Sequence, residues 1–453
     1  MKYLCYLCLI ISGLFGVMSC IEDDVTTDSG VEVRFSTDTV HMGIVFTEEL
    51  SPTAQFKIFN PNSKGIIVSS VSIDGDGADY HLLVNGGSGE YAENVEIRSR
   101  DSIVVFVNVL HQANGTGTVV SKDAAVNVVV NGVTHKLVIN SLAQDVHRLD
   151  DYAVAGDMTL TAEMPYKVTG ELSVGESGHL RILSGARVYF HDKARLTVKG
   201  QLTAEGTADA PIIFSGDRHG YVVSDIPYEI MSGQWDGVYF DSSCSDNVMS
   251  HVMIKNTVNG VTATSSDKGA LKLLNCVLHN SQNSVLCAEN SDITAVGCEF
   301  SDAPHGVVSI SGGNGVFNHC TFANNYLFAA TDGALLSVGE NADVEVANSI
   351  FYGIGGSVAV HDSGTGYFRS CLIKESGEDD EDFVDILWNS DPMFITDREE
   401  YLFDYRLKQD SPAIGAANPE LTLPEAERDF YGNPRGVQPD MGAYKYVVML
   451  ETV

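Results

Sequence analysis

The segment 217–236 gathers side chains of the types that contact sugars. Acidic, basic and aromatic residues occur together there, namely Asp217, Arg218, Tyr228 and Trp235. Charged groups exchange hydrogen bonds with hydroxyls, and an aromatic ring offers a flat apolar surface on which a sugar ring can stack. The segment is too long for a tight turn, so we expect a loop that leaves the main scaffold. In the alternative interpretation, Trp235 and Tyr239 only pack this loop onto the scaffold.

A second candidate group is basic. Lys255, Lys272 and His279 fall close together in the sequence and could share one face of a sheet. A polysaccharide lyase needs a base together with calcium or a basic group that neutralises a uronate carboxylate, and a hydrolase needs a pair of carboxyl groups. We recognise neither constellation and predict no catalytic residue. We assign the three residues to ligand binding, and the alternative is that they are solvated side chains on exposed strands.

The overall charge restricts the possible ligands. The chain has 27 Lys and Arg against 61 Asp and Glu, a formal net charge of −34. This nearly excludes nucleic acid as the main partner, because binding to phosphates depends on clusters of Lys and Arg. The acidic segment 74–79 lacks the full calcium-loop pattern, and we interpret the run 375–385 as a solvated insertion. We therefore expect no metal site and no cofactor, with weak calcium binding as the alternative.

The elements that would position these residues form a repeat. One short pattern recurs along the chain: a small residue is followed two positions later by a large apolar residue. The recurrences are equally spaced apart from one longer step, and their small residues are Cys276, Cys298, Cys320, Ser349 and Cys371. A second short strand follows in each repeat, at Val261, Val285, Val307 and Val358. Repeats of this length, made only of strands and turns, predict a parallel β-helix over 147–385 in which equivalent side chains stack in interior columns.

The spacing changes upstream of these repeats. Leu180, Leu196 and Ile212 follow one another at equal but smaller steps, and we expect shorter coils over 166–216. The mature chain keeps six internal cysteines, and no Cys-x-x-Cys pair occurs among them, so a zinc or redox site is not indicated. We expect the cysteines of the repeat to be buried thiols, since free cysteine behaves as a small hydrophobic residue.

The segment 31–146 predicts a β-sandwich. Alternating apolar residues form several short runs, and Asn131-Gly132 separates two of them. Asn-Gly supplies the positive φ angles of a tight hairpin turn. The segment resembles the immunoglobulin-like N-terminal domains of Bacteroidetes surface lipoproteins. The preceding acidic segment 20–30 is expected to be a polar tether.

The N-terminus predicts export. Lys2 precedes an apolar run that is too short to span a membrane, as in a signal peptide over 1–19. The run ends with small residues before Cys20, which resembles the lipobox of bacterial lipoproteins and implies lipid attachment to Cys20. The acidic cluster after Cys20, Glu22-Asp23-Asp24, resembles the surface-export signal of Bacteroidetes lipoproteins. The resemblance implies an outer-membrane protein that faces the extracellular side; the alternative is a soluble secreted protein.

The final segment, 386–453, is predicted to be a C-terminal cap over the last coil, with Arg435 and Asp440 as a candidate ion pair. Its motifs, among them Asp429-Phe430-Tyr431-Gly432-Asn433-Pro434-Arg435-Gly436, resemble the choice-of-anchor region at the end of bacterial β-helix surface proteins. Many right-handed β-helices also resemble pectate-lyase-like enzymes. The chain is thus predicted to be an all-β protein in which a sandwich precedes a right-handed parallel β-helix.

Three functions remain open. We favour a non-catalytic surface protein that binds a glycan or a host partner, because recognisable catalytic constellations are missing. The second hypothesis is a polysaccharide lyase or glycoside hydrolase that acts on an exported polysaccharide. The third is a structural spacer in the surface layer.

Overall fold

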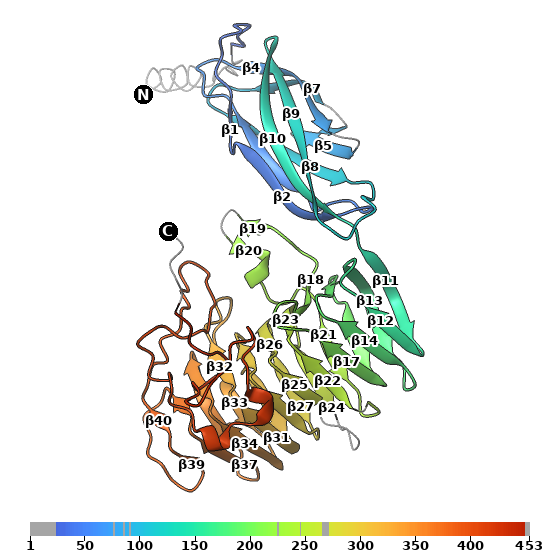
Figure 1. Cartoon of the computed structure of the whole chain (residues 1–453). Coiled ribbons are helices and arrows are strands. Elements are labelled where there is room, and N and C mark those ends of the chain that lie inside the picture. Colours follow the sequence, from blue (N-terminus) through green and yellow to red (C-terminus); the bar gives the residue numbers. More distant parts are fainter. Residues whose placement is uncertain are drawn as a thin grey trace, which may run out of the picture. The chain divides into compact units, whose positions relative to one another are not determined.

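The computed structural model describes residues 24–75, 78–84, 87–89, 92–223, 226–244, 246–264 and 271–448 (Figure 1). The predicted signal peptide 1–19, the predicted lipid-attachment residue Cys20, and Asp76 and Gly77 of the acidic segment 74–79 lie outside the described residues. The chain divides into two compact units, Met1–Gly115 with Val119–Gln144, and Thr116–Thr118 with Asp145–Val453. No helix among the described residues is long and apolar enough to cross a membrane.

The first unit is a sandwich of two five-stranded sheets. One sheet has the order β1 (Arg34–Phe35), β3 (Ala54–Phe59), β8 (Ser102–Leu110), β5 (Asp79–Val84) and β6 (Gly87–Gly89). The other has the order β2 (Thr39–Phe46), β10 (Val133–Gln144), β9 (Val120–Val130), β4 (Ile66–Gly75) and β7 (Ala92–Ile97). Alternate side chains of both sheets fill one core, as in Phe56, Val105 and Val128. The predicted hairpin is confirmed, because Asn131 and Gly132 have φ angles of 50° and 81° between β9 and β10.

The second unit is a parallel β-helix whose coils contribute strands to three faces, so the predicted fold class is confirmed. We call the faces the first, second and third sheet, in the order in which the chain visits them. The first sheet contains the first halves of β11 (His147–Val154) and β13 (Tyr166–Val174), then β15 (Arg187–Phe190), β18 (Ile212–Gly216), β23 (Val252–Thr257), β26 (Val277–Ser281), β29 (Glu299–Ser301), β32 (Thr321–Asn324), β35 (Ile350–Gly353), β38 (Leu372–Ile373) and β40 (Leu387–Trp388).

The other two faces follow the same stacking (Figure 1). The second sheet contains the second halves of β11 and β13, then β16 (Arg195–Val198), β21 (Gly237–Phe240), β24 (Val261–Thr264), β27 (Leu286–Glu289), β30 (Val308–Ser311), β33 (Ala334–Val338) and β36 (Gly356–Val360). The third contains β12 (Asp157–Leu160), β14 (His179–Leu183), β17 (Gln201–Glu205), β22 (Asn247–Ser250), β25 (Leu271–Leu274), β28 (Ile293–Val296), β31 (Gly313–Asn318), β34 (Ala342–Ala347), β37 (Thr365–Arg369) and β39 (Phe383–Val384).

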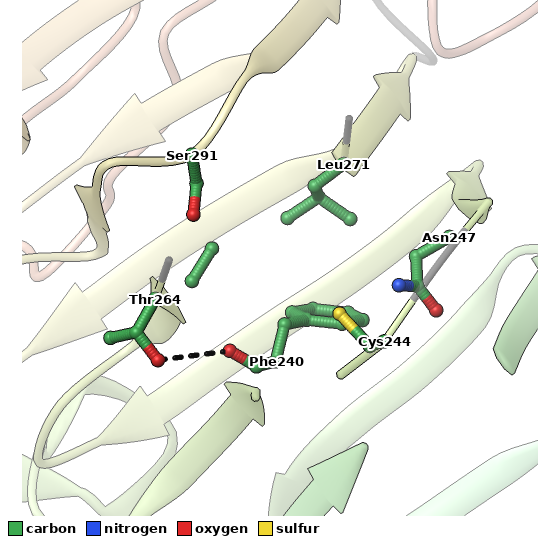
Figure 2. Close-up of a pocket in the computed structure, with 7 residues that line it drawn as sticks. Phe240, Cys244, Asn247, Thr264, Leu271 and Ser291 are labelled. Atoms are coloured by element: carbon green, nitrogen blue, oxygen red, sulfur yellow. Dashed lines mark hydrogen bonds between the residues drawn. The ribbon is translucent and has the colours of Figure 1, made fainter. Parts of the chain in front are cut away.

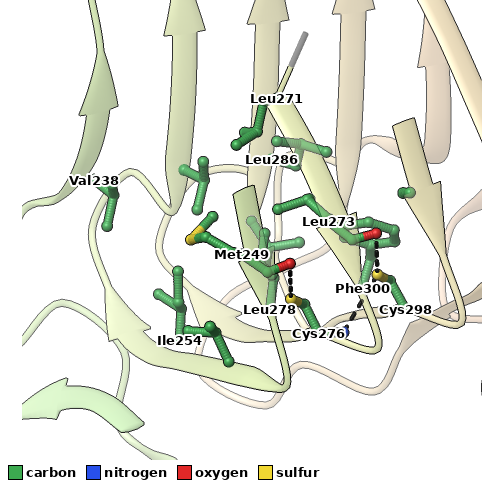
Figure 3. Close-up of a cluster of buried hydrophobic side chains, with 14 of the residues drawn as sticks. Val238, Met249, Ile254, Leu271, Leu273, Cys276, Leu278, Leu286, Cys298 and Phe300 are labelled. Atoms are coloured by element: carbon green, nitrogen blue, oxygen red, sulfur yellow. Dashed lines mark hydrogen bonds between the residues drawn. The ribbon is translucent and has the colours of Figure 1, made fainter. Parts of the chain in front are cut away.

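The predicted interior columns are confirmed. Strand register aligns Val277 with Glu299, Glu299 with Thr321, and so on to Leu372, which places the preceding Cys and Ser residues in one line. The backbone N–H of Cys276 donates to Sγ of Cys298 over 3.4 Å, and both thiols lie in the buried core (Figure 3). In the parallel column the rings of Phe322 and Phe351 stack with centroids 4.5 Å apart. These columns fill the interior of the β-helix, because each coil places a similar side chain directly above the equivalent one in the previous coil.

The predicted shorter coils over 166–216 are wrong. Leu180 lies in β14 on the third sheet, Leu196 in β16 on the second, and Ile212 in β18 on the first. The step between these residues therefore leads from one face to another and is not one turn of the helix. The strands of all three faces bury alternate residues, so alternation alone does not identify the face. For the same reason, the sequence predicts at least two strands in each repeat, and the strands of the third sheet become apparent only in the structure.

The acidic run 375–385 is largely exposed to solvent, as predicted for an insertion, and its end contributes Phe383 to the closure of the β-helix. The ring of Phe383 stacks on Phe368, with centroids 4.7 Å apart, and the Asp379 carboxylate accepts hydrogen bonds from the Asp385 backbone N–H (2.8 Å) and from Trp388 Nε1 (3.0 Å). The hydrogen bonds of Asp379 hold the run in place, so that aromatic side chains cover the last coil.

The rest of the C-terminal segment covers the outer side of the first sheet, and its two 3₁₀ helices, η2 (Pro419–Leu421) and η3 (Pro424–Ala426), lie beside the ends of β31 and β34, where Asn318 donates to the Leu421 carbonyl and Asn348 to the Asn418 carbonyl. Its apolar residues pack on outward side chains of four strands of that sheet, which are Val277, Ala323, Ile350 and Leu372. The segment thus lies along the β-helix, rather than only over its last coil. Arg435 donates to the carbonyls of Gly442 (3.0 Å) and Ala443 (2.6 Å), while Asp440 pairs with Lys445 at 2.9 Å, so the expected Arg435–Asp440 contact is replaced by separate partners.

Candidate functional site

Trp235, a predicted ligand-binding residue, is part of the core. Its side chain is fully buried, its ring stacks on Phe190 with centroids 4.0 Å apart, and Nε1 donates to the Lys255 carbonyl over 2.8 Å. A fully buried ring offers no surface on which a sugar can stack, so the ligand-binding assignment of Trp235 is wrong. The alternative interpretation, in which Trp235 packs the loop onto the scaffold, agrees with the structure.

The other residues predicted in the loop 217–236 also hold the loop together. The Asp217 side chain is 7% exposed, and its Oδ2 lies 3.0 Å from Lys167 Nζ and 2.7 Å from His191 Nδ1. The Arg218 guanidinium lies over the ring of Tyr228, 5.9 Å from the centroid. Tyr228 begins η1 (Tyr228–Ile230), which follows the short hairpin β19 (Tyr221–Val223) and β20 (Ile226–Pro227). These contacts make Asp217, Arg218 and Tyr228 loop-positioning residues.

The structure brings together two of the three predicted basic residues. Lys255 in β23 and His279 in β26 are register partners, and both point outward from the first sheet. Lys272 lies in β25 on the third sheet, where its Nζ pairs with Glu425 at 2.8 Å. The expectation that all three residues share a face is therefore wrong for Lys272, because the chain turns to another face between positions 255 and 272.

Lys255 and His279 lie on the floor of a cleft of about 340 Å³. The floor is formed by outward side chains of β23, β26 and β29. One wall is the end of η1, and the other is the C-terminal segment. We call this site the cleft, and its lining residues are Glu229, Ile230, Met253, Lys255, Val277, His279, Glu299, Tyr401, Leu402, Phe403, Asp404, Tyr405, Tyr431 and Tyr444.

Two buried carboxyl groups lie at the cleft. Glu299 accepts hydrogen bonds from the Ser301 and Tyr444 hydroxyls, and burial raises its pKa to about 7. Asp302, which adjoins the cleft behind His279, accepts from the Tyr405 hydroxyl at 2.6 and 2.7 Å, and burial raises its pKa to about 6. Each carboxyl group is thus bound to a tyrosine of the C-terminal segment, which fixes that segment to the first sheet.

His279 is part of the same network. Its Nδ1 lies 2.9 Å from Ser301 Oγ, and the Ser301 hydroxyl donates to Glu299, so Nδ1 donates to Ser301. Burial, assisted by the charge of Lys255, lowers the pKa of His279 to about 3. The imidazole is therefore uncharged at neutral pH, and it contributes hydrogen bonding rather than positive charge to the floor.

Most residues of the cleft could not be predicted from the sequence. Tyr431 is its most open aromatic residue, with 49% of its surface exposed. Asp404 is held by Arg406, whose Nε lies 2.9 Å from Oδ1. One local signal was present for Glu299: it carries a charge at a repeat position where neighbouring coils have Val277, Thr321 and Ile350. The tyrosines carried no such signal, because they lie far along the chain from the strands that they cover.

A second hollow lies between the second and third sheets (Figure 2). It is lined by Phe240, Cys244, Asn247, Ala263, Thr264, Leu271 and Ser291. Its free volume of about 10 Å³ admits at most one water molecule. The cleft on the first sheet is therefore the better candidate for a ligand.

Comparison with known proteins supports the fold. The family model described as "Right handed beta helix region" matches residues 228–377, which is the part of the chain that contains the floor of the cleft. A search of curated proteins finds no match. Among solved structures, the chain is similar to a family 123 glycoside hydrolase from Clostridium perfringens, with 6% identity and a TM-score of 0.20 over 26% of this chain and 30% of that chain. The chain thus spans less than a third of that hydrolase, and a likeness this low carries no argument about function.

Proposed function

We propose that this protein is a lipid-anchored cell-surface protein that binds a glycan in the cleft without transforming it. The observation that carries the proposal is that one cleft is lined both by a solvent-exposed aromatic residue, Tyr431, and by polar side chains. A tyrosine ring can cover the apolar face of a pyranose, while Lys255 and Asp404 can exchange hydrogen bonds with its hydroxyls. Anchoring through Cys20 at the outer membrane would present this cleft to extracellular glycans or to a host surface.

The hydrogen-bonding state of the carboxyl groups favours binding over catalysis. A general acid or a nucleophile must reach the reacting atoms of its substrate. Both oxygens of Glu299 already accept hydrogen bonds from protein hydroxyls, and Asp302 is bound by Tyr405. Groups that are satisfied in this way hold two parts of the fold together, and a substrate would have to break those bonds first.

One observation supports a second candidate function, glycoside hydrolysis. A carboxyl group with a pKa near 7 is suited to protonate a leaving glycosidic oxygen, and Glu299 has such a pKa in the floor of the cleft. Asp404, another lining residue, would then be the second carboxylate. An assay of new reducing ends across a panel of polysaccharides distinguishes hydrolysis from binding alone. If the protein is a hydrolase, the wild type produces new reducing ends and Glu299→Gln does not.

The binding proposal is tested with Tyr431→Ala. We expect the mature chain to bind at least one glycan of an array, and Tyr431→Ala to weaken that binding about tenfold or more because it removes the stacking surface. Tyr152→Ala is the matched control, because Tyr152 is 43% exposed and lies on β11, away from the lining residues of the cleft. Equal affinities of wild type and Tyr431→Ala would contradict the proposal, and silence on the array together with no turnover would favour a structural spacer.

A further inference from the structure

The positive charge of the cleft is already balanced. Among the described lining residues, Lys255 is the one cationic side chain, because His279 is uncharged. Lys255 Nζ lies 3.9 Å from Glu229 Oε1. Glu229 reaches over from η1, and its side chain is 71% exposed, whereas that of Lys255 is 21% exposed. Glu229 is therefore the more solvent-accessible partner of this ion pair.

None of the other described lining residues is a cation, and Arg398, whose charge acts on Asp302, lies outside the lining and donates to the Tyr326 carbonyl over 3.3 Å. Asp404 lines the cleft, and Arg406 is committed to it through contacts to both carboxylate oxygens. Glu299 lies in the floor and Asp302 adjoins the cleft, and both are acids. A second carboxylate placed here would raise the electrostatic energy, since like charges within a few ångström oppose each other's ionisation. A neutral sugar hydroxyl carries no charge and so meets no electrostatic repulsion, and it can form hydrogen bonds with both donors and acceptors that line the cleft.

We infer that the cleft selects uncharged sugars over uronic acids, and that Glu229 imposes this selection by neutralising Lys255. The inference rests on the proposed glycan-binding function and adds the class of ligand and a residue that determines specificity. Selection of this kind works by opposing the wrong ligand, because a uronate must either displace Glu229 from Lys255 or lie unpaired among acids. The net charge of −34 acts in the same direction at longer range.

The test measures two ligand classes against three proteins. The mature wild type, Glu229→Gln and Glu345→Gln are titrated calorimetrically with neutral oligosaccharides and with oligogalacturonate and oligoglucuronate. Glu345 is an exposed residue of β34 on the third sheet, so its substitution makes the same charge change away from the cleft. Glu229→Gln removes the counter-charge of Lys255, and because Glu229 is exposed we expect the variant to fold like the wild type.

We expect the wild type to bind a neutral oligosaccharide and to bind uronates about tenfold more weakly or not at all. Glu229→Gln is expected to strengthen uronate binding about two- to fivefold at low salt, with a smaller gain at high salt, and to change neutral-sugar affinity by less than this. Glu345→Gln is expected to change neither affinity beyond the small general effect of one charge.

Other results separate the inference from the proposed function. If the wild type binds uronates more tightly than neutral sugars, and Lys255→Met removes that binding, the selection rule is overturned while glycan binding stands. If Glu229→Gln and Glu345→Gln change uronate binding equally, Glu229 is not the determinant. If no glycan of either class binds, both the inference and the proposed function fail.

Discussion

The Glu299 carboxyl group predicts a pH-dependent loss of stability that one substitution removes. Glu299 is buried beneath the C-terminal segment, and burial raises its pKa from the ordinary 4.5 to about 7. The folded protein therefore holds the Glu299 proton more tightly than the unfolded chain does. This stabilising effect is fully present below pH 4.5 and is lost as the pH rises through 7.

The size of the effect follows from the two pKa values. A difference between 4.5 and about 7 corresponds to about 3 kcal/mol of unfolding free energy between pH 4.5 and pH 8. Glutamine has nearly the same shape and does not ionise. We therefore expect Glu299→Gln and wild type to differ little near pH 4.5, and the variant to be more stable by about 3 kcal/mol at pH 8. Titratable groups far from Glu299 cancel in this comparison, whereas Asp302 is coupled to Glu299 because its charge contributes to the raised pKa of Glu299.

Tryptophan fluorescence during denaturation by urea is a suitable assay. The chain has two tryptophans, Trp235 and Trp388, and both belong to the second unit, so the signal reports on the β-helix alone. Unfolding free energies are measured at intervals of half a pH unit from 4.5 to 8 for wild type, Glu299→Gln and the exposed-site control Glu345→Gln. A difference in unfolding free energy between wild type and Glu299→Gln that stays constant over this pH range would refute the reasoning. The reasoning would also be refuted if Glu345→Gln gained stability over wild type with rising pH as much as Glu299→Gln does.

Two further predictions concern cysteines. In the folded mature chain, iodoacetamide should modify the half-buried Cys287 before the buried thiols of the interior column, which are Cys276, Cys298, Cys320 and Cys371. Burial hides these column thiols from the reagent, and it raises the pKa of Cys371 to about 12. Peptide mass spectrometry identifies the modified cysteines, and labelling of Cys298 in the folded protein would contradict the prediction. Cells fed a labelled fatty acid should incorporate it into the wild type but not into Cys20→Ser, which should leave the membrane fraction; undiminished labelling would disprove the anchor.

The sequence could predict the β-helix because its interior repeats. The small residues before β26, β29, β32, β35 and β38 must occupy equivalent sites, since each coil lies directly on the previous one. A spacing of about one coil therefore appears in the sequence as a column of Cys and Ser. The hairpin at Asn131-Gly132 was predictable for a local reason, since its φ angles suit those two residues.

The face on which an outward residue lies was not predictable in the same way. Lys255 and Lys272 both occupy outward positions of short alternating strands, yet they belong to the first and third sheets. The same ambiguity produced the wrong interpretation of the equal steps from Leu180 to Ile212. All three sheets follow one pattern of burial, so only the turns between strands decide the face, and those turns vary in length.

The scaffold and the motifs that indicate export follow from the order of the amino acids alone, and the strongly acidic charge follows from their composition. The site depends on how distant segments pack together. Trp235 became core because Phe190, from the preceding coil, covers its ring, and the cleft formed because Tyr405 and Tyr444 return to bind Asp302 and Glu299. These contacts join residues that are far apart in the chain, and their energy depends on a shared buried environment that no local pattern records.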